Sequence, residues 1–163
     1  YGQDFPFDKI LNEVHAYIED IFSNNGVPLK KGAMNLLEFL KNESIKIGLA
    51  TSSVRHRVDL ILEKANVSSY FDVTVCGDEI QHSKPDPEIF LTACQKLGVH
   101  PSEAIVLEDS ENGIIGASEG KIKCIHVPDL KASSETIKER AEYIAKHLDD
   151  VTTYIKKEYK YNE

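Results

Sequence analysis

The sequence has few positively charged side chains, and only three of them are arginines. It contains 19 Lys and Arg residues against 27 Asp and Glu residues, which gives a formal net charge of -8 at pH 7. A chain with this balance lacks the broad positive surface that neutralises a nucleic-acid backbone or an anionic bilayer. We therefore expect neither nucleic acid nor a membrane as a partner.

Cysteine is also scarce. The three cysteines, Cys76, Cys94 and Cys124, are an odd number, lie far apart in the sequence and form no CxxC pair. This usage suggests neither a disulfide framework nor a zinc cluster. We expect all three to be small buried hydrophobic residues in a reducing compartment.

Long apolar runs and targeting signals are absent too. No window approaches about 18 consecutive apolar residues, and the opening YGQDFPFDKI lacks the basic and apolar regions of a secretory signal. We expect a soluble, cytoplasmic protein. Because the sequence begins with Tyr1 rather than Met, we also expect it to be a processed or truncated piece.

The sequence is otherwise that of an ordinary globular domain. Its 163 residues are 41% hydrophobic and 28% charged, enough for one compact domain with a real core. Residues 8–22 place apolar side chains at three- and four-residue spacings, which predicts an amphipathic helix that ends at Asn24, Asn25 and Gly26. We interpret residues 24–31 as a hinge between this leading helix and the α/β core.

Beyond the hinge, short apolar segments alternate with stretches of helical spacing. The expected helices are 32–41, 54–66, 86–97 and 111–119, and the expected strands are 45–50, 73–76, 104–107 and 123–127. Short apolar strands joined by helix-length crossovers favour a parallel sheet covered on both faces. The sequence thus predicts a doubly wound, Rossmann-like α/β fold. One or two further helices are expected from Ser133 to about Lys157, with a packing face made of Ile137, Ala141, Ile144, Ala145 and Leu148.

Ligands of an open parallel sheet gather at the carboxyl ends of its strands, so the residues that follow each strand are the candidates for function. Thr51, Ser52 and Ser53 follow the first expected strand and precede a helix. Their hydroxyls, the free backbone N–H groups and the helix dipole favour an anion there, which predicts a phosphate seat. Simple capping of the helix by Ser or Thr is the alternative.

A lysine lies in a rigid frame after the second strand. Pro85 and Pro87 restrict the backbone at the entrance of the next helix, which holds Lys84 in a defined place. A fixed ammonium group can neutralise a phosphoryl group during transfer. The alternative is an ordinary solvated surface lysine.

Two adjacent carboxylates, Glu108 and Asp109, follow the third strand. Carboxylate oxygens at a strand end suit Mg²⁺, which prefers one or two carboxylates together with water and substrate phosphate. An acidic pair can also act only as a helix cap. Together the three strand ends predict hydroxyls, a lysine and a carboxylate pair around one crevice.

Four segments carry these residues in a distinctive order: LATSS (49–53), HSKPDPEIF (82–90), VLEDSENGIIGA (106–117) and HVPD (126–129). In this order and separation they resemble the haloacid dehalogenase superfamily. The resemblance is to the subgroup of β-phosphoglucomutase-like proteins and small sugar-phosphate phosphatases, and it spans roughly residues 28–130.

The resemblance implies a Mg²⁺-dependent phosphatase that works through an aspartyl-phosphate and acts on a small phosphorylated metabolite such as a sugar phosphate. Thr51 would hydrogen-bond the transferring phosphoryl group, helped by the backbone N–H of Ser52. Lys84 would bind that group and the nucleophile. Glu108 and Asp109 would hold Mg²⁺.

One part of the family's machinery has no match. The family's nucleophile is an aspartate in a DxDGT- or DxDGV-type motif on the first strand, and no such motif occurs in the printed sequence. We therefore interpret residues 1–25 as the remnant of a helical cap and residues 26–163 as a core without its first strand. Such a piece is expected to be inert, or to be complemented by a separate segment. Unpaired edges of the neighbouring strands are expected to allow self-association.

The position after the serine cluster bears on the substrate. Relatives with mutase activity tend to carry a lysine there that grips a second phosphate, whereas this sequence has Val54, followed by Arg55 and Arg57. Arg55 is a candidate substrate contact, and the missing lysine favours a phosphatase over a phosphosugar mutase. A non-catalytic phosphate-binding module is the alternative from another class.

Overall fold

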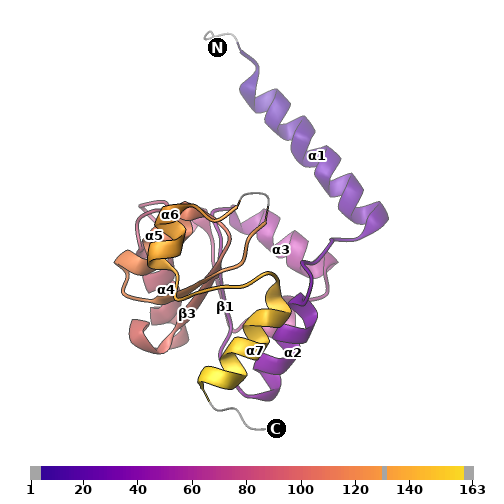
Figure 1. Ribbon diagram of the computed structural model, residues 1–163. Coiled ribbons are helices and arrows are strands. Elements are labelled where there is room, and N and C mark those ends of the chain that lie inside the picture. Colours follow the sequence, from indigo (N-terminus) through magenta and orange to yellow (C-terminus); the bar gives the residue numbers. More distant parts are fainter. Residues whose placement is uncertain (1–4, 130–131, 160–163) are drawn as a thin grey trace.

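The computed structural model describes residues 5–129 and 132–159, in which helices alternate with short parallel strands (Figure 1). The helices are α1 (Phe7–Asn25), α2 (Ala33–Asn42), α3 (Arg55–Lys64), α4 (Glu88–Leu97), α5 (Glu111–Glu119), α6 (Glu135–Arg140) and α7 (Leu148–Glu158). The strands are β1 (Gly48–Ala50), β2 (Val73–Val75), β3 (Ile105–Glu108), β4 (Lys123–His126) and β5 (Tyr143–Ile144). Three 3-10 turns cover Ser68–Tyr70 (η1), Gly77–Glu79 (η2) and Pro101–Glu103 (η3). The predicted α/β alternation with parallel strands is confirmed.

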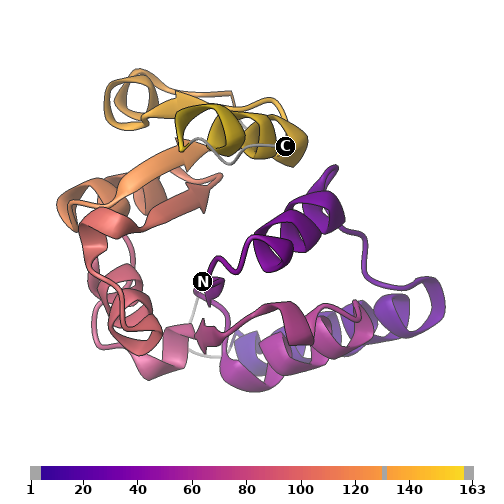
Figure 2. The ribbon, with the colours of Figure 1, turned by 90° about the horizontal axis from the view of Figure 1, so that it is seen from below.

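The strands form two sheets and not the single sheet that we predicted. β1 pairs with β2, and β3, β4 and β5 pair in that order, all in parallel. Figure 2 shows the two groups of strands as separate ribbons. Within the described ranges, β1 and β3 each pair with a strand on one side only. Self-association through these edges stays a prediction.

Helices pack against both sheets. α4 packs on β1 and β2, α5 packs on β3 and β4, and α4 also contacts α5, so one helical layer runs beneath both sheets. A first core cluster fills this layer, with Val75, Ile89, Ile114 and Cys124 among its buried members.

A second core cluster lies on the opposite face of the three-stranded sheet, under α2 and α7, which pack on each other. Ile125 and Val127 belong to it, whereas Cys124 belongs to the first cluster. The period of two along a strand explains this division, because successive side chains of β4 point to opposite faces. All three cysteines are buried and free, as predicted.

The C-terminal part corrects one sequence prediction. Residues 141–145 do not continue a helix, because Ala141 is already extended and β5 follows it. The backbone N–H groups of Glu142 and Ala145 donate to the carbonyls of Cys124 and His126 at 2.8 and 2.9 Å. Residues 142–145 therefore pair with the free edge of β4. The backbone hydrogen bonds to β4 favour a strand here, although the spacing of the apolar residues favours a helix.

Helix α1 extends away from the rest of the molecule (Figure 1). It confirms the predicted helix, and it ends before Gly26, which has a left-handed φ of 75°. Its C-terminal half contacts α3, while Phe7, Val14 and Tyr17 are exposed. None of the described helices is long and apolar enough to cross a membrane.

The domain division at residues 25 and 26 stays a prediction. No helix covers the connection between Asn25 and Ala33, which includes most of the predicted hinge. Residues 1–4, 130–131 and 160–163 fall within the predicted domain boundaries but lie outside the described residues.

Candidate active site

The loop after β1 lies against the residues that follow β2. The backbone N–H of Thr51 donates to the Val75 carbonyl at 3.0 Å, and the N–H of Gly77 donates to the Ser53 carbonyl at 2.9 Å. A Cβ atom at Gly77 would lie 2.3 Å from the backbone oxygen of Ser52, so only glycine permits this approach. Thr51 Oγ1 accepts a hydrogen bond from the Ser53 N–H at 3.2 Å. The predicted phosphate seat is therefore a tightly held turn at the start of α3.

Lys84 and Glu108 form a largely buried ion pair between the two sheets. The distance from Lys84 Nζ to Glu108 Oε1 is 2.7 Å, and the two side chains are 13% and 10% exposed. Lys84 follows β2 of one sheet and Glu108 ends β3 of the other. Their contact brings the carboxyl ends of both sheets to one place, where a parallel α/β fold binds its ligands.

Glu108 is held from several sides. Ser110 Oγ donates to its Oε1 and the Asp109 N–H donates to its Oε2, both at 3.0 Å. Burial acts to raise the pKa of Glu108, but the hydrogen bond and charge of Lys84, together with the hydrogen bonds from Ser110 and the Asp109 N–H, hold that pKa below its usual range. The start of α5 leaves room for this carboxylate because residue 113 is glycine. A Cβ atom at Gly113 would lie 1.7 Å from Glu108 Oε1.

Asp109 differs from Glu108 because its carboxylate faces solvent. It is 46% exposed, and its Oδ2 lies 3.8 Å from Lys30 Nζ. Lys30 Nζ also lies 3.5 Å from Oδ2 of Asp129, which follows β4. The strand-end rule that singled out Asp109 could also have found Asp129. No sequence pattern pointed to Lys30, because its role depends on a contact with residues far along the chain.

Arg55 lies at the start of α3 but is already bound to protein groups. Its Nε donates to Glu79 Oε1 at 2.8 Å, and its Nη2 donates to the Thr74 carbonyl at 2.8 Å and also to Glu79. Asp59 lies 3.3 Å from Nη1. The hydrogen bond from Arg55 lowers the pKa of Glu79. A phosphate contact by Arg55 stays a prediction, and it would require this guanidinium to leave Glu79.

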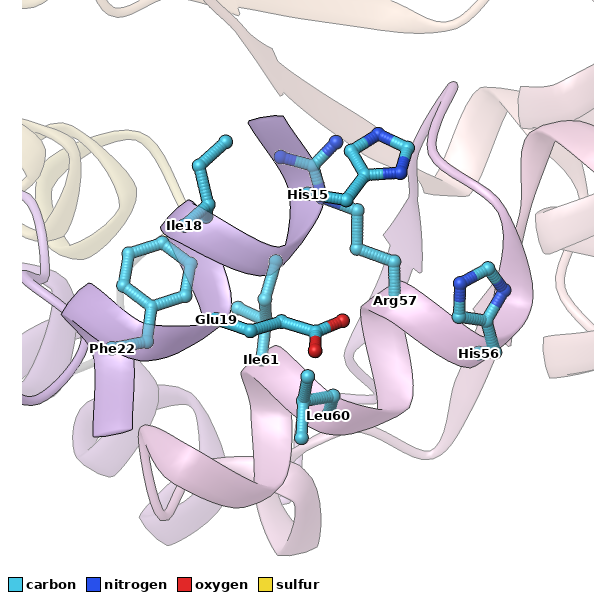
Figure 3. Close-up of a pocket in the computed structure, with 8 residues that line it drawn as sticks. All are labelled: His15, Ile18, Glu19, Phe22, His56, Arg57, Leu60 and Ile61. Atoms are coloured by element: carbon cyan, nitrogen blue, oxygen red, sulfur yellow. The ribbon is translucent and has the colours of Figure 1, made fainter. Parts of the chain in front are cut away.

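A small pocket lies between α1 and α3 (Figure 3). The side chains of His15 and Glu19 come from α1, and those of His56 and Arg57 come from α3. Its space of about 10 Å³ holds a single water at most. The pocket itself is therefore too small to be a substrate site.

A further group of possible ligands lies in the frame around Lys84. One ligand atom each of His82, Asp86 and Glu88 lies within 4.8 Å of the others. Glu88 accepts the backbone N–H groups of Gln81 and His82 at 2.8 Å, and Asp86 accepts the Glu88 N–H at 2.9 Å. These contacts assign the group to holding the loop that carries Lys84.

The donor set fits a hard divalent cation such as Mg²⁺. Asp109 and Asp129 offer exposed carboxylate oxygens, and the Lys30 ammonium already stands between them as a cation. Oxygen donors with access to water suit Mg²⁺. Glu108, the other predicted ligand, has both carboxylate oxygens engaged by Lys84, Ser110 and the Asp109 N–H. It is thus less available to a metal than Asp109.

Residues 3–127 match the family model of the haloacid dehalogenase-like hydrolases. The chain is 39% identical over 119 residues to a phosphorylated carbohydrates phosphatase of Thermotoga maritima, covering 73% of this chain and 55% of that protein. It is 35% identical over 147 residues to validoxylamine A 7'-phosphate phosphatase of Streptomyces hygroscopicus subsp. limoneus, covering 88% and 66%. The chain thus spans between half and two thirds of the length of these two relatives.

The fold has relatives among solved structures as well. A crystal structure of a Thermotoga maritima protein, provisionally identified as a beta-phosphoglucomutase, superposes with a TM-score of 0.82 at 29% identity and covers 95% of this chain and 72% of that one. The beta-phosphoglucomutase of Clostridium difficile gives a TM-score of 0.75 at 25% identity, covering 91% and 63%.

Proposed function

We propose, since this chain belongs to the haloacid dehalogenase-like hydrolase family, that it supplies the phosphate- and cation-binding part of a phosphatase for small phosphorylated metabolites. The observation that carries the proposal is the buried Lys84–Glu108 pair at the carboxyl ends of both sheets. The names of the two enzymes that the chain resembles in sequence favour phosphorylated carbohydrates and related compounds as the substrate class.

Lys84 is proposed to bind the phosphoryl group. Its ammonium is held at 2.7 Å by Glu108 and lies 4.8 Å from the centroid of the Phe90 ring, so its position is fixed before a ligand arrives. A preorganised positive charge shielded from water stabilises charge on a transferring phosphoryl group more strongly than a mobile one. The Thr51 hydroxyl and the Ser52 N–H group are proposed to bind the remaining phosphoryl oxygens. The Ser53 N–H, which donates to Thr51 Oγ1 at 3.2 Å, would join them only by leaving that oxygen.

Asp109 is proposed to be the principal Mg²⁺ ligand. Glu108 would be a secondary ligand, through lone pairs of its carboxylate that Lys84 does not occupy. Bound Mg²⁺ would offset the negative charge of the phosphate monoester. Asp109 suits this role because it is exposed at the strand end next to Lys84's partner, while Glu108 keeps the lysine in place.

The nucleophile is proposed to come from a strand that carries the family's aspartate motif and pairs with β1 and β3. The free edges of these two strands support this position, since within the described residues neither edge has a strand partner. On this proposal residues 1–25 belong to a cap, and the chain shows little turnover unless such a strand is supplied.

A phosphosugar mutase is the second candidate, favoured by the structural likeness to the beta-phosphoglucomutase of Clostridium difficile. Val54 argues against it, because an apolar side chain at the start of α3 cannot grip a second phosphate. A requirement for a bisphosphate activator would support the mutase. A module that binds phosphate without turnover is the remaining alternative.

The test measures phosphate release from a panel of sugar phosphates, with and without Mg²⁺, by the chain alone and with an added peptide that carries a DxDGT-type strand. We expect Mg²⁺-dependent release only with the peptide, and loss of that release in Asp109→Ala. Lys64→Met provides a lysine control, because the exposed Lys64 lies at the end of α3. No gain on addition of the peptide contradicts complementation.

Binding of inorganic phosphate, followed by ³¹P NMR, tests the seat without turnover. Both Lys84→Met and Thr51→Val should weaken it, and the second variant leaves the buried pair intact. Phosphate binding that is unchanged in both variants contradicts the proposed seat.

A further inference from the structure

We propose that Lys30 is an intramolecular cation that occupies the Asp109–Asp129 carboxylate pair and competes with a divalent cation for it. The choice of a divalent cation as competitor rests on the proposed function. The placement of Lys30 does not, because it follows from the contacts of the described residues.

The sheet brings the two carboxylates to the same side of the molecule, where both reach Lys30. β3 and β4 pair in parallel with Glu108 opposite His126, so Asp109 and Asp129 both lie just beyond the same edge. Among the described residues, neither carboxylate has a hydrogen-bond or ion-pair partner other than Lys30. Two negative charges that share an edge repel each other, and a cation between them relieves that repulsion.

The turn that carries Lys30 is fixed. The Lys30 carbonyl accepts the Ala33 N–H at 3.0 Å, and the Lys31 carbonyl accepts the Leu148 N–H at 3.2 Å. Gly32 has a φ of 83°, and a Cβ atom there would lie 2.5 Å from the backbone nitrogen of Asp149. The start of α7 thus holds the backbone of this turn, and the lysine side chain reaches the carboxylates from a constant point.

The contact itself is weak enough to be displaced. The Nζ to Oδ2 distances of 3.8 and 3.5 Å are ion-pair distances rather than hydrogen-bond distances, and all three side chains are about half exposed. Exposed ion pairs of this kind contribute little to stability. A divalent cation has twice the charge of the ammonium and is attracted more strongly by the two carboxylates, so it can replace Lys30, whose ammonium then moves into water.

The test is a titration with Mn²⁺, followed by electron paramagnetic resonance of the free ion and by paramagnetic broadening of amide NMR signals. In Lys30→Met we expect the dissociation constant for Mn²⁺ to fall about two- to fivefold, the size expected for weak exposed pairs. Lys30→Arg, which keeps the charge, should stay near wild type. Lys31→Met is the matched control, because it removes the neighbouring exposed charge but not the contact.

Two further results are expected. In 0.5 M KCl the difference between wild type and Lys30→Met should shrink, because salt screens exposed charges. Broadening should centre on the amides of Asp109 and Asp129, and in an Asp129→Asn background the effect of Lys30→Met should be smaller.

The inference is overturned if Lys30→Met binds Mn²⁺ no more tightly than wild type and Lys31→Met, or if broadening centres elsewhere. This readout does not depend on turnover. If Lys30→Met binds Mn²⁺ more tightly as expected but no phosphate is released in the activity test, only the proposed function is refuted. If phosphate release depends on Mg²⁺ but Lys30→Met binds Mn²⁺ like wild type, only this inference is refuted.

Discussion

Replacing Glu108 by Gln removes one charge of the Lys84–Glu108 pair and keeps its size. At the observed 2.7 Å, two unit charges attract each other by roughly 6 kcal/mol when the effective dielectric constant is about 20. The loss of hydration on burial offsets much of this attraction. The substitution, however, leaves the Lys84 ammonium buried without a counter-charge, and breaking a buried pair in this way costs about 3–5 kcal/mol.

Urea unfolding of four proteins measures the interaction energy between the two side chains. The four proteins are wild type, Glu108→Gln, Lys84→Met and the double variant. The double variant should lose less stability than the two single losses combined, because it leaves no unpaired buried charge. Glu135→Gln is the control. Its pair with Lys138 is as short, at 2.6 Å, but the two side chains are 82% and 52% exposed, so we expect little change.

The advantage of wild type over Glu108→Gln should depend on pH. The pKa of Glu108 is lowered in the folded protein from an ordinary value of 4.5, with Lys84 as the main cause that lowers it. A carboxylate with a depressed folded pKa stabilises the protein fully above the unfolded pKa, and this contribution is lost as the pH falls through the folded pKa. The difference between the two proteins should therefore be constant near pH 7 and shrink below about pH 4.5.

Two outcomes would refute this reasoning. One is a loss in Glu108→Gln no larger than that in Glu135→Gln, which would mean that burial adds nothing to the pair. The other is a double variant whose loss equals the sum of the single losses, which would mean that Lys84 and Glu108 do not act on each other.

Three further predictions concern the core around the site. Ile114→Ala should lower the free energy of unfolding by about 2–5 kcal/mol, because Ile114 is fully buried; equal losses in urea for this variant and for the exposed Ile10→Ala would contradict the core assignment. Gly113→Ala should displace Glu108 and weaken phosphate binding, because its Cβ would lie 1.7 Å from Glu108 Oε1; wild-type phosphate affinity in ³¹P NMR would show that the carboxylate has other room. Burial raises the pKa of the Cys124 thiol to about 12, so labelling by a thiol reagent at pH 8 should be slow in the native protein and fast in urea, and fast native labelling would argue against this burial.

The residues at the strand ends could be predicted because local signals determine them. Glu108 and Asp109 directly follow a short apolar stretch, which the structure shows as β3, and they precede a stretch of helical spacing, which it shows as α5. Lys84 lies between a strand and a helix that begins after two prolines, and both elements were predicted from apolar spacing. The parallel-sheet rule then places Thr51, Lys84 and Asp109 at carboxyl ends.

Local sequence signals were thus enough to establish the order of helices and strands and which residues follow each strand, because hydrophobic period and capping act within a few residues. The three-dimensional structure was needed to show that Tyr143 and Ile144 form a strand, that Arg55 binds Glu79, and that the sheet divides between β1 and β3. It was also needed to show that Lys30 lies beside Asp109 and Asp129. These outcomes depend on contacts between residues that are distant in the chain, and a free strand edge or an unpaired charge takes whichever partner the fold brings near it.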